Sequence, residues 1–418
     1  MIRPFGLFTL TTGSGVLSGG RIVFPTAMLT AAEKVSTRDI TGTIRDILGE
    51  TVEAKKQEHV KKLHAYPPEE VGSCWLELLN DAVRVSTTIR IIDHMSEYND
   101  KRFVLPLAKH LISPHYAIRR SAARALKRIG DDRLFPVILN MVNSANPVHR
   151  IYFIEAMNFL YDRRFYPSLT GMLRDDNKSI RIYVLNCLKE NKITESIGLI
   201  RGSALSDKND EVRIAAIEAI GAMRDMNSLG TLSMTLNDKN RDVRRESAKS
   251  LGLINSVACV NTLSLRLFVE DDNEIKELML ETLAVLKRAG DVRGLEKILL
   301  TDNSLGLRVK AAYILGYSGS MQAFAALQKA LFDSDFRVRA EVCNSLGNYR
   351  NRQSLASLFD VLEKEEQVYV KSAALYSIKR INDKSSLMGL FDLFTRENDP
   401  IFRELLHNAI QEYIRRYI

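Results

Sequence analysis

Apolar and small residues recur along the chain in a ten-residue pattern that is clearest at Val212–Gly221 (VRIAAIEAIG). Its apolar positions have helical spacing and predict one buried stripe of Val212, Ala215, Ala216, Ala219 and Ile220. Further copies begin at Val83, Ile118, His149, Ile180, Val243, Ile275, Leu307, Val338, Val370 and Phe402, at intervals of 31 to 35 residues. The pattern therefore predicts an all-α fold, an α-α superhelix (α-solenoid) of about ten to eleven 31–32-residue helix-turn-helix repeats.

Within a repeat, a second, shorter helix follows the ten-residue pattern, as at residues 228–236, where Leu229, Leu232 and Leu236 are expected to face inward. Residues 238–242 predict the turn and the N-cap of the next helix. Four copies of the ten-residue pattern end in glycine, which predicts a left-handed helix C-cap at Gly221, Gly252, Gly316 and Gly347. Neither helix can bury its stripe alone, so stacked repeats must form the core.

The second position of every copy is basic, and in eight of the eleven copies an acidic residue stands six positions before it. We expect a ladder of charge-assisted hydrogen bonds that fixes the register between repeats. A row of catalytic or ligand-binding acids is the less favoured interpretation. The predicted ladder comprises Asp175, Arg181, Asp207, Arg213, Asp238, Arg244, Asp302, Arg308, Asp333 and Arg339.

The VRxAAxxALG-type core and the acid six residues before its arginine resemble HEAT repeats, in the short variant of the phycobilisome-lyase-like group. The resemblance covers about residues 80–418 and implies a HEAT-like solenoid. It implies little about function, because such repeats serve as scaffolds, adaptors, bilin lyases, a metal-dependent hydroxylase and DNA glycosylases.

The N-terminal part of the chain differs from the repeats, and we expect three regions. Residues 1–29 are a flexible segment rich in glycine and threonine, residues 30–79 a helical cap region, and residues 80–418 the solenoid. Polar residues interrupt the apolar stretch of the first segment, so a flexible or partner-ordered segment is favoured over a signal peptide. The cap helix should bury one face, consisting of Ile40, Ile44, Ile47 and Leu48.

The array ends on half a repeat, Phe402–Tyr413, with no partner helix after it. The last residues either fold back on the final repeat or contact another chain, and we favour the fold-back. Self-association through the C-terminal end is the alternative. The residues concerned are Tyr413, Ile414, Tyr417 and Ile418.

Composition narrows the classes of function. The four cysteines are scattered singly, and no histidine spacing suits a metal, so neither a metal site nor a disulfide framework is predicted. No nucleotide-binding or nucleophile motif occurs, so we expect no cofactor and no enzyme, although lyase-like activity is left open. No run of apolar residues is long enough to span a membrane, and the absence of a convincing export segment suggests a cytoplasmic location.

The leading functional hypothesis is a scaffold or adaptor that binds a protein partner along the concave face, which we assign to the second helices. The residues expected on that face are Arg133, Asn140, Arg164, Arg174, Asn227, Met234, Lys297, Gln322, Lys329, Gln353 and Asp360. The start of this row is basic and its middle is uncharged, which favours a polypeptide with an acidic segment over nucleic acid.

Two alternatives remain open. The chain carries a net charge of +8, and residues 114–200, with 14 basic and 8 acidic side chains, could bind nucleic acid. Part of this charge lies on one helix and could form a basic patch for an anionic partner, although a solvated helix face that includes a ladder arginine is the favoured interpretation; the residues are Arg119, Arg120, Arg124, Lys127 and Arg128. The other alternative is a bilin-lyase-like chaperone for a prosthetic group, for which no residue stands out.

Overall fold

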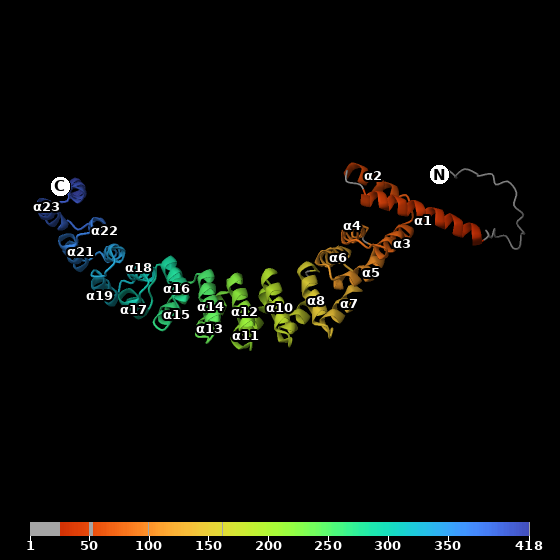
Figure 1. Cartoon of the computed structure of the whole chain (residues 1–418), viewed down its shortest axis with the longest axis horizontal. Helices are drawn as coiled ribbons and strands as arrows, with labels where there is room; N and C mark the ends of the chain where they lie inside the picture. Colours follow the sequence, from red (N-terminus) through yellow and green to blue (C-terminus); the bar gives the residue numbers. More distant parts are fainter. Residues whose placement is uncertain (1–25, 50–52, 99, 161, 418) are drawn as a thin grey trace, which may run out of the picture. The chain divides into compact units, whose positions relative to one another are not determined.

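The computed structural model describes residues 26–49, 53–98, 100–160 and 162–417, with side chains from residue 38 on except at 53–57. All regular elements in this part of the chain are helices, as the apolar periodicity predicted (Figure 1). They belong to two compact units, residues 1–161 and 162–418. Most of the predicted flexible segment 1–29 lies outside the described residues, and its last four residues begin a helix.

Unit 1 contains the cap region and the first repeats. Its helices are α1 (Thr26–Gly49), α2 (Glu53–Leu63), α3 (Pro68–Asn80), α4 (Val85–Met95), η1 (Lys101–Phe103), α5 (Val104–Lys109), η2 (His110–Ile112), α6 (Tyr116–Ile129), α7 (Leu134–Val142) and α8 (Pro147–Leu160).

Unit 2 contains the remaining repeats. Its first helices are η3 (Arg163–Phe165), α9 (Tyr166–Gly171), η4 (Met172–Arg174), α10 (Lys178–Glu190), η5 (Thr194–Ser196), α11 (Ile197–Ser206), α12 (Asp210–Met223), η6 (Met226–Ser228), α13 (Leu229–Thr235), α14 (Arg241–Ile254), η7 (Val257–Cys259) and α15 (Val260–Leu267). The others are α16 (Asn273–Leu286), α17 (Arg293–Thr301), α18 (Leu305–Leu315), α19 (Met321–Ala330), α20 (Phe336–Leu346), α21 (Arg352–Lys364), α22 (Val368–Ile381), α23 (Ser386–Arg396) and α24 (Pro400–Tyr417).

The helices of unit 2 form two layers, because like helices of consecutive repeats pack side by side. The ten-residue pattern forms the even-numbered helices α10 to α24, which we call the even layer, and the shorter helices α9 to α23 form the odd layer (Figure 1). The predicted stripe of α12 is buried. In the next helix, α13, Leu232 is fully buried and Leu229 is half-buried, and Leu236 directly after the helix is fully buried. The core therefore lies between the layers, as the stacking argument required.

The turn before α14 behaves as predicted. Asn240 is the N-cap of α14, and its side-chain oxygen accepts hydrogen bonds from the backbone N–H groups of Asp242 and Val243. These bonds satisfy two of the N–H groups that a helix leaves unpaired at its start.

The prediction of left-handed glycine caps is wrong. Gly221 and Gly252 lie inside α12 and α14, and Gly316 and Gly347 have φ of −59° and −61°. The left-handed residue comes three positions later, where Arg224 has φ 52° and Asn255 φ 52°. The same offset places Gly130, Lys192, Lys287, Gly319, Arg350 and Asn382 in this conformation.

The first copy of the ten-residue pattern, which starts at Val83, is also not helical from its first residue. Val83 is 95% exposed, and Arg84 is the N-cap of α4, which begins at Val85. In the cap region, Ile40, Ile44 and Ile47 are buried as predicted and Leu48 is half-buried.

The C-terminal helix α24 folds back on the preceding repeat. The Tyr413 hydroxyl donates to the Ile378 carbonyl at 3.0 Å, and the Tyr417 hydroxyl donates to the Asn382 carbonyl at 2.6 Å. Tyr413 is buried, so the aromatic end of the chain covers α22.

Candidate functional site

A ladder of ion pairs runs through the turns of unit 2. The Arg181 guanidinium donates to the Asp207 carboxylate at 2.7 and 2.8 Å, and its third nitrogen donates to the Asp175 carbonyl at 2.7 Å. Each arginine thus joins the backbone of its own repeat to the carboxylate of the next. The same arrangement joins Arg213 to Asp238, Arg244 to Glu270, Arg308 to Asp333 and Arg339 to Glu365. In two further repeats the cation is a lysine, which pairs Lys276 with Asp302 and Lys371 with Glu397.

The ladder groups are largely buried, which suits a structural role. Arg181 and Asp207 side chains are 4% and 9% exposed. Burial opposes ionisation of Glu270, but hydrogen bonds from Arg244 and Arg266 outweigh it and hold its pKa below the usual value. The carboxylates of Asp207, Asp238, Glu270, Asp302, Asp333, Glu365 and Glu397 are each paired with a cation, so these acids are not free for catalysis.

In unit 1 a different acid replaces the missing ladder carboxylate. Arg119 donates to Glu155 of α8 at 2.7 Å and to the Ser113 carbonyl at 2.8 Å, and it lies 3.9 Å from the centre of the Tyr152 ring. The side chain is 9% exposed. The prediction that Arg119 belongs to an exposed basic patch is therefore wrong, because this arginine holds α6 against α8. The other predicted patch residues are exposed on α6: Arg120, Arg124, Lys127 and Arg128.

All eleven residues predicted to face a partner are exposed. They lie on the odd-numbered helices or in the short segments directly before or after them. Unit 1 holds Arg133 and Asn140, and unit 2 holds Arg164, Arg174, Asn227, Met234, Lys297, Gln322, Lys329, Gln353 and Asp360. Their position on a concave face remains a prediction.

The arginines at the start of this row are compensated by local acids. Arg133 and Arg164 each fold back on an aspartate two residues earlier, with nitrogen–oxygen distances of 2.8 and 2.7 Å to Asp131 and Asp162. The hydrogen bonds from Arg133 lower the pKa of Asp131 to about 2. Arg174 makes no ion pair with any residue that the structure describes. Within this part of the row, it is the cation most available to an acidic partner.

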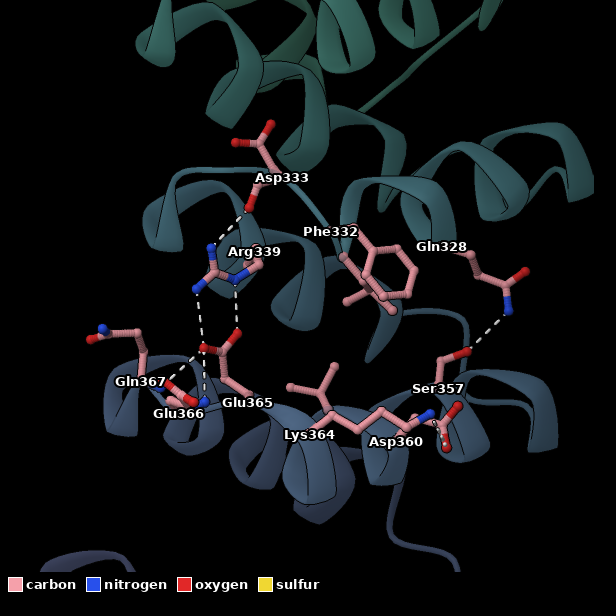
Figure 2. Close-up of a pocket in the computed structure, with 12 residues that line it drawn as sticks. Gln328, Phe332, Asp333, Arg339, Ser357, Asp360, Lys364, Glu365, Glu366 and Gln367 are labelled. Atoms are coloured by element: carbon pink, nitrogen blue, oxygen red, sulfur yellow. Dashed lines mark hydrogen bonds and ion pairs between the residues drawn. The ribbon is translucent and has the colours of Figure 1, made fainter.

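The odd layer contains a cleft of about 550 Å³ between the C-terminal ends of α19 and α21 (Figure 2). Leu331, Phe332 and Val361 supply its apolar lining. Phe332 is 86% exposed, because α19 ends at Ala330 and the chain turns away from the core at this point. An aromatic side chain this exposed at the edge of a cleft is an apolar surface that a binding partner could cover.

The walls of the cleft are fixed by hydrogen bonds that Figure 2 shows. On one side Arg339 pairs with Glu365 at 2.7 Å, and on the other Gln328 donates to the Ser357 hydroxyl at 3.0 Å. Four carboxylates line the cleft against two cations: Asp333, Asp360, Glu365 and Glu366 against Arg339 and Lys364.

Two similar clefts occur at other repeats of the odd layer. One of about 450 Å³ includes Arg174 and Leu199, and one of about 250 Å³ includes Lys297 and Thr301. The sequence had predicted Arg174, Lys297 and Asp360 from these clefts as partner-facing residues, but it did not single out Phe332. The signal that could have found Phe332 is an aromatic residue directly before the ladder acid, where a helical apolar stripe has already ended.

The described residues include no group of three or more metal-ligating side chains, and all four cysteines are buried with free thiols. Burial raises the pKa of the Cys187 thiol to about 12, so this thiol is a weak nucleophile at neutral pH. No described helix is long and apolar enough to cross a membrane.

A family model for HEAT repeats matches residues 104–189, 200–284 and 292–379, well over half of the chain. The chain belongs to the HEAT-repeat family. Among curated proteins, the bilin biosynthesis protein PecE of Nostoc sp. is 31% identical over 107 residues, which are 24% of this chain and 42% of PecE.

Solved HEAT-repeat structures show the same fold. Kap121p matches with a TM-score of 0.56 and 12% identity, over 89% of this chain and 48% of Kap121p. Kap121p bound to RanGTP matches with a TM-score of 0.55 and 13% identity, over 90% of this chain and 48% of that one. The HEAT-repeat chain therefore spans about half the length of Kap121p, and identities this low establish the fold alone.

Proposed function

We propose that this HEAT-repeat chain is a non-enzymatic scaffold that binds a polypeptide partner along its odd layer, with the α19–α21 cleft as an anchoring site. The observation that carries the proposal is Phe332, which is 86% exposed beside a preformed cleft of about 550 Å³. Exposed aromatic side chains at the edge of a cleft are typical anchors of protein–protein interfaces.

Further apolar side chains support a polypeptide partner. The odd layer of unit 2 exposes at least one large apolar residue in most repeats, namely Leu199, Met234, Leu265, Leu300, Met321 and Met388. A groove that follows a nucleic-acid backbone requires cations along its length. Acids outnumber cations in the α19–α21 cleft instead.

The basic region at residues 114–200 gives little support to nucleic-acid binding, because many of its cations are paired. Arg119 and Arg181 are buried in ion pairs, and Lys178 and Lys189 pair with Glu211 and Glu218. Charges that are already compensated release few counterions on binding. We propose that the acidic segment of a polypeptide partner, if present, meets Arg174.

The fold neighbours are compatible with this proposal. Solved complexes of Kap121p contain RanGTP and Nup53p. Extended HEAT arrays provide long surfaces for such partners.

The test is affinity capture with the tagged full chain from its native host, with and without nuclease, using the wild type and Phe332→Ala. A protein partner should survive nuclease, and Phe332→Ala should weaken its binding by about tenfold or more, as truncation of a central aromatic anchor does. Tyr369→Ala is the matched control, since Tyr369 is 63% exposed but lies on the even layer. Loss of all captured material on nuclease treatment, or equal binding by Phe332→Ala, would contradict the proposal.

A second candidate function is that of a chaperone for a bilin, which the match to PecE favours. The α19–α21 cleft is large enough for a small ligand, but its excess of carboxylates is poorly complementary to an anionic pigment. The absorbance of the protein purified from its native host distinguishes the two: a visible band that persists through gel filtration supports the chaperone function.

A further inference from the structure

Unit 1 contains a cleft of about 430 Å³ that helices α1, α3 and α4 surround, and its lining is basic. Three arginines line it: Arg45 of α1, Arg84 directly before α4, and Arg90 of α4. All three are exposed, and none forms an ion pair with a residue that the structure describes. Among the described residues of the lining, Asp81 is the one acid, so the cleft has an excess of two positive charges.

The ladder explains why Arg84 has no ion pair. In unit 2 a ladder cation pairs with the acid that stands six residues before the next ladder cation, as Arg181 does with Asp207. For Arg84 the next ladder cation is Arg119, and the residue six positions before it is Ser113. A serine hydroxyl carries no charge, so the sequence supplies no carboxylate for Arg84 at this position.

The start of α4 removes the second ladder contact as well. Helix α10 begins at Lys178, three residues before Arg181, whose guanidinium donates back to the Asp175 carbonyl. Helix α4 instead begins at Val85, one residue after Arg84. The Arg84 side chain makes no hydrogen bond with a described residue, and it lines the cleft at the point where the later repeats bury their arginine.

The cleft also offers apolar surface next to its cations. Leu48 and Leu78 are half-buried in the lining, and Ile91 is buried. Val83 is 95% exposed and directly precedes Arg84. A ligand that carries an anionic group beside an apolar side chain therefore matches this lining in both respects.

The charge of the cleft favours a dianion. Positive side chains that line one cleft repel one another and concentrate their field on a bound anion. A phosphate monoester carries about −1.5 to −2 charges at neutral pH, and its three terminal oxygens accept hydrogen bonds from guanidinium groups. It compensates the excess of two positive charges, whereas a carboxylate compensates one of them. Binding to a nucleic-acid strand requires cations along the whole backbone path, and these three arginines gather at one cleft instead.

We propose that Arg45, Arg84 and Arg90 bind a phosphorylated serine or threonine side chain of a polypeptide, with a neighbouring apolar residue of the peptide against Val83. Clusters of arginine are a recurrent means of recognising phosphorylated peptides. This inference rests on the proposed function in requiring a polypeptide partner, but it assigns a separate site, in unit 1, that contains none of the residues of the α19–α21 cleft.

The test uses the full chain and fluorescein-labelled probe peptides with the sequence Gly-Ser-Gly-Leu-X-Leu-Gly-Ser-Gly, in which X is phosphoserine, glutamate or serine. We expect saturable binding of the phosphoserine probe, measured by fluorescence anisotropy, and binding of the serine probe that is weaker by about tenfold or more. The glutamate probe should lie between the two, because it carries a single charge.

Two pairs of variants locate the site. Val83 is almost fully exposed, so neither Val83→Glu nor Val83→Gln should change the melting temperature. Val83→Glu adds a carboxylate to the lining and should weaken binding of the phosphoserine probe by about tenfold, whereas Val83→Gln, of the same size without the charge, should retain it. Arg84→Gln should weaken binding by about five- to tenfold. Its matched control is Arg120→Gln, which removes an exposed arginine of unit 1 outside the cleft and should leave binding unchanged.

Several results would overturn the site. These are no saturable binding of the phosphoserine probe, equal binding of this probe and either other probe, and equal losses in Arg84→Gln and Arg120→Gln, which would indicate attraction to the overall positive charge. Vesicles of phosphatidylcholine and phosphatidylinositol bisphosphate test the other source of phosphate monoesters. If wild type but not Val83→Glu sediments with these vesicles, and the phosphoserine probe does not bind, the cleft binds a lipid headgroup and the peptide site is wrong.

The outcome is separable from that of the proposed function. If the phosphoserine probe does not bind while Phe332→Ala weakens capture of the native partner, this inference fails and the proposed function stands. If the probe binds as expected while Phe332→Ala leaves capture unchanged, the phosphate site stands and the α19–α21 anchoring site fails.

Discussion

At the scale of single residues, the distance between neighbouring helices decides which side chain is allowed. A Cβ added to Gly347 would lie 2.7 Å from the Ser377 Cβ of the next repeat, and one added to Gly316 would lie 2.8 Å from the Ser345 Cβ. Glycine is required here because consecutive even-numbered helices approach closely. A glycine at the end of an apolar pattern suggests a C-cap from sequence alone, and only the packing of the next repeat reveals the other reason.

We predict that Gly347→Ala lowers the free energy of unfolding by about 1–3 kcal/mol, because the added methyl group overpacks the contact with α22. Urea unfolding of the full chain measures the change. Gly202→Ala is the matched control, since Gly202 is also helical but has open space around it. That substitution should raise stability by about 0.5–1 kcal/mol through helix propensity. A neutral Gly347→Ala would show that α20 and α22 can separate without loss.

At the scale of elements, each ladder arginine fixes one helix pair against the next. The alternation of acids and bases in the sequence was sufficient to predict that a ladder exists. It did not give the pairing, because in a stack of repeats an acid can meet either the arginine six residues later in its own repeat or the arginine of the preceding repeat. Arg213 shows the result: its guanidinium donates to the Asp238 carboxylate of the next repeat, while Asp207 of its own repeat supplies a backbone carbonyl.

We predict that Asp207→Ala lowers the free energy of unfolding by about 3 kcal/mol, because it leaves the buried Arg181 guanidinium without its carboxylate. The loss should spread to neighbouring repeats, since solenoid repeats couple to their nearest neighbours. Amide hydrogen exchange should therefore show reduced protection in both α10 and α12. Glu211→Ala is the control, because it removes an exposed ion pair between the same two helices and should cost less than about 1 kcal/mol. Equal stability of the two variants would mean that the ladder does not hold the repeats together.

At the scale of the whole molecule, the ladder should make the free energy of unfolding decrease as the pH falls into the acidic range. Burial opposes ionisation of Glu365 and Glu397, but hydrogen bonds from Arg339 and Lys371 outweigh it and keep both pKa values below the usual value. A carboxylate whose pKa is lower in the folded state contributes stability above its unfolded pKa, and loses it as the pH falls through the folded pKa.

We therefore predict that the melting temperature is nearly constant from about pH 7 to 5 and falls steadily below about pH 4.5, where unfolded glutamates begin to bind protons. Scanning calorimetry across this range provides the measurement. Glu365→Gln should lower the melting temperature at neutral pH and flatten the decline at acidic pH. If the melting temperature begins to fall near pH 6, protonation of histidines, and not of the ladder carboxylates, would be the cause.

The sequence by itself determined the all-helical fold, the repeat length, the buried stripes and the existence of the ladder, because these depend on periodicities within one chain segment. Tertiary structure alone decided which acid pairs with which arginine, why glycine ends the ten-residue pattern in four copies, and that Arg119 is buried against Glu155. It also decided where Phe332 lies exposed beside a cleft. These properties depend on distances between repeats, which stacking sets and which no single segment encodes.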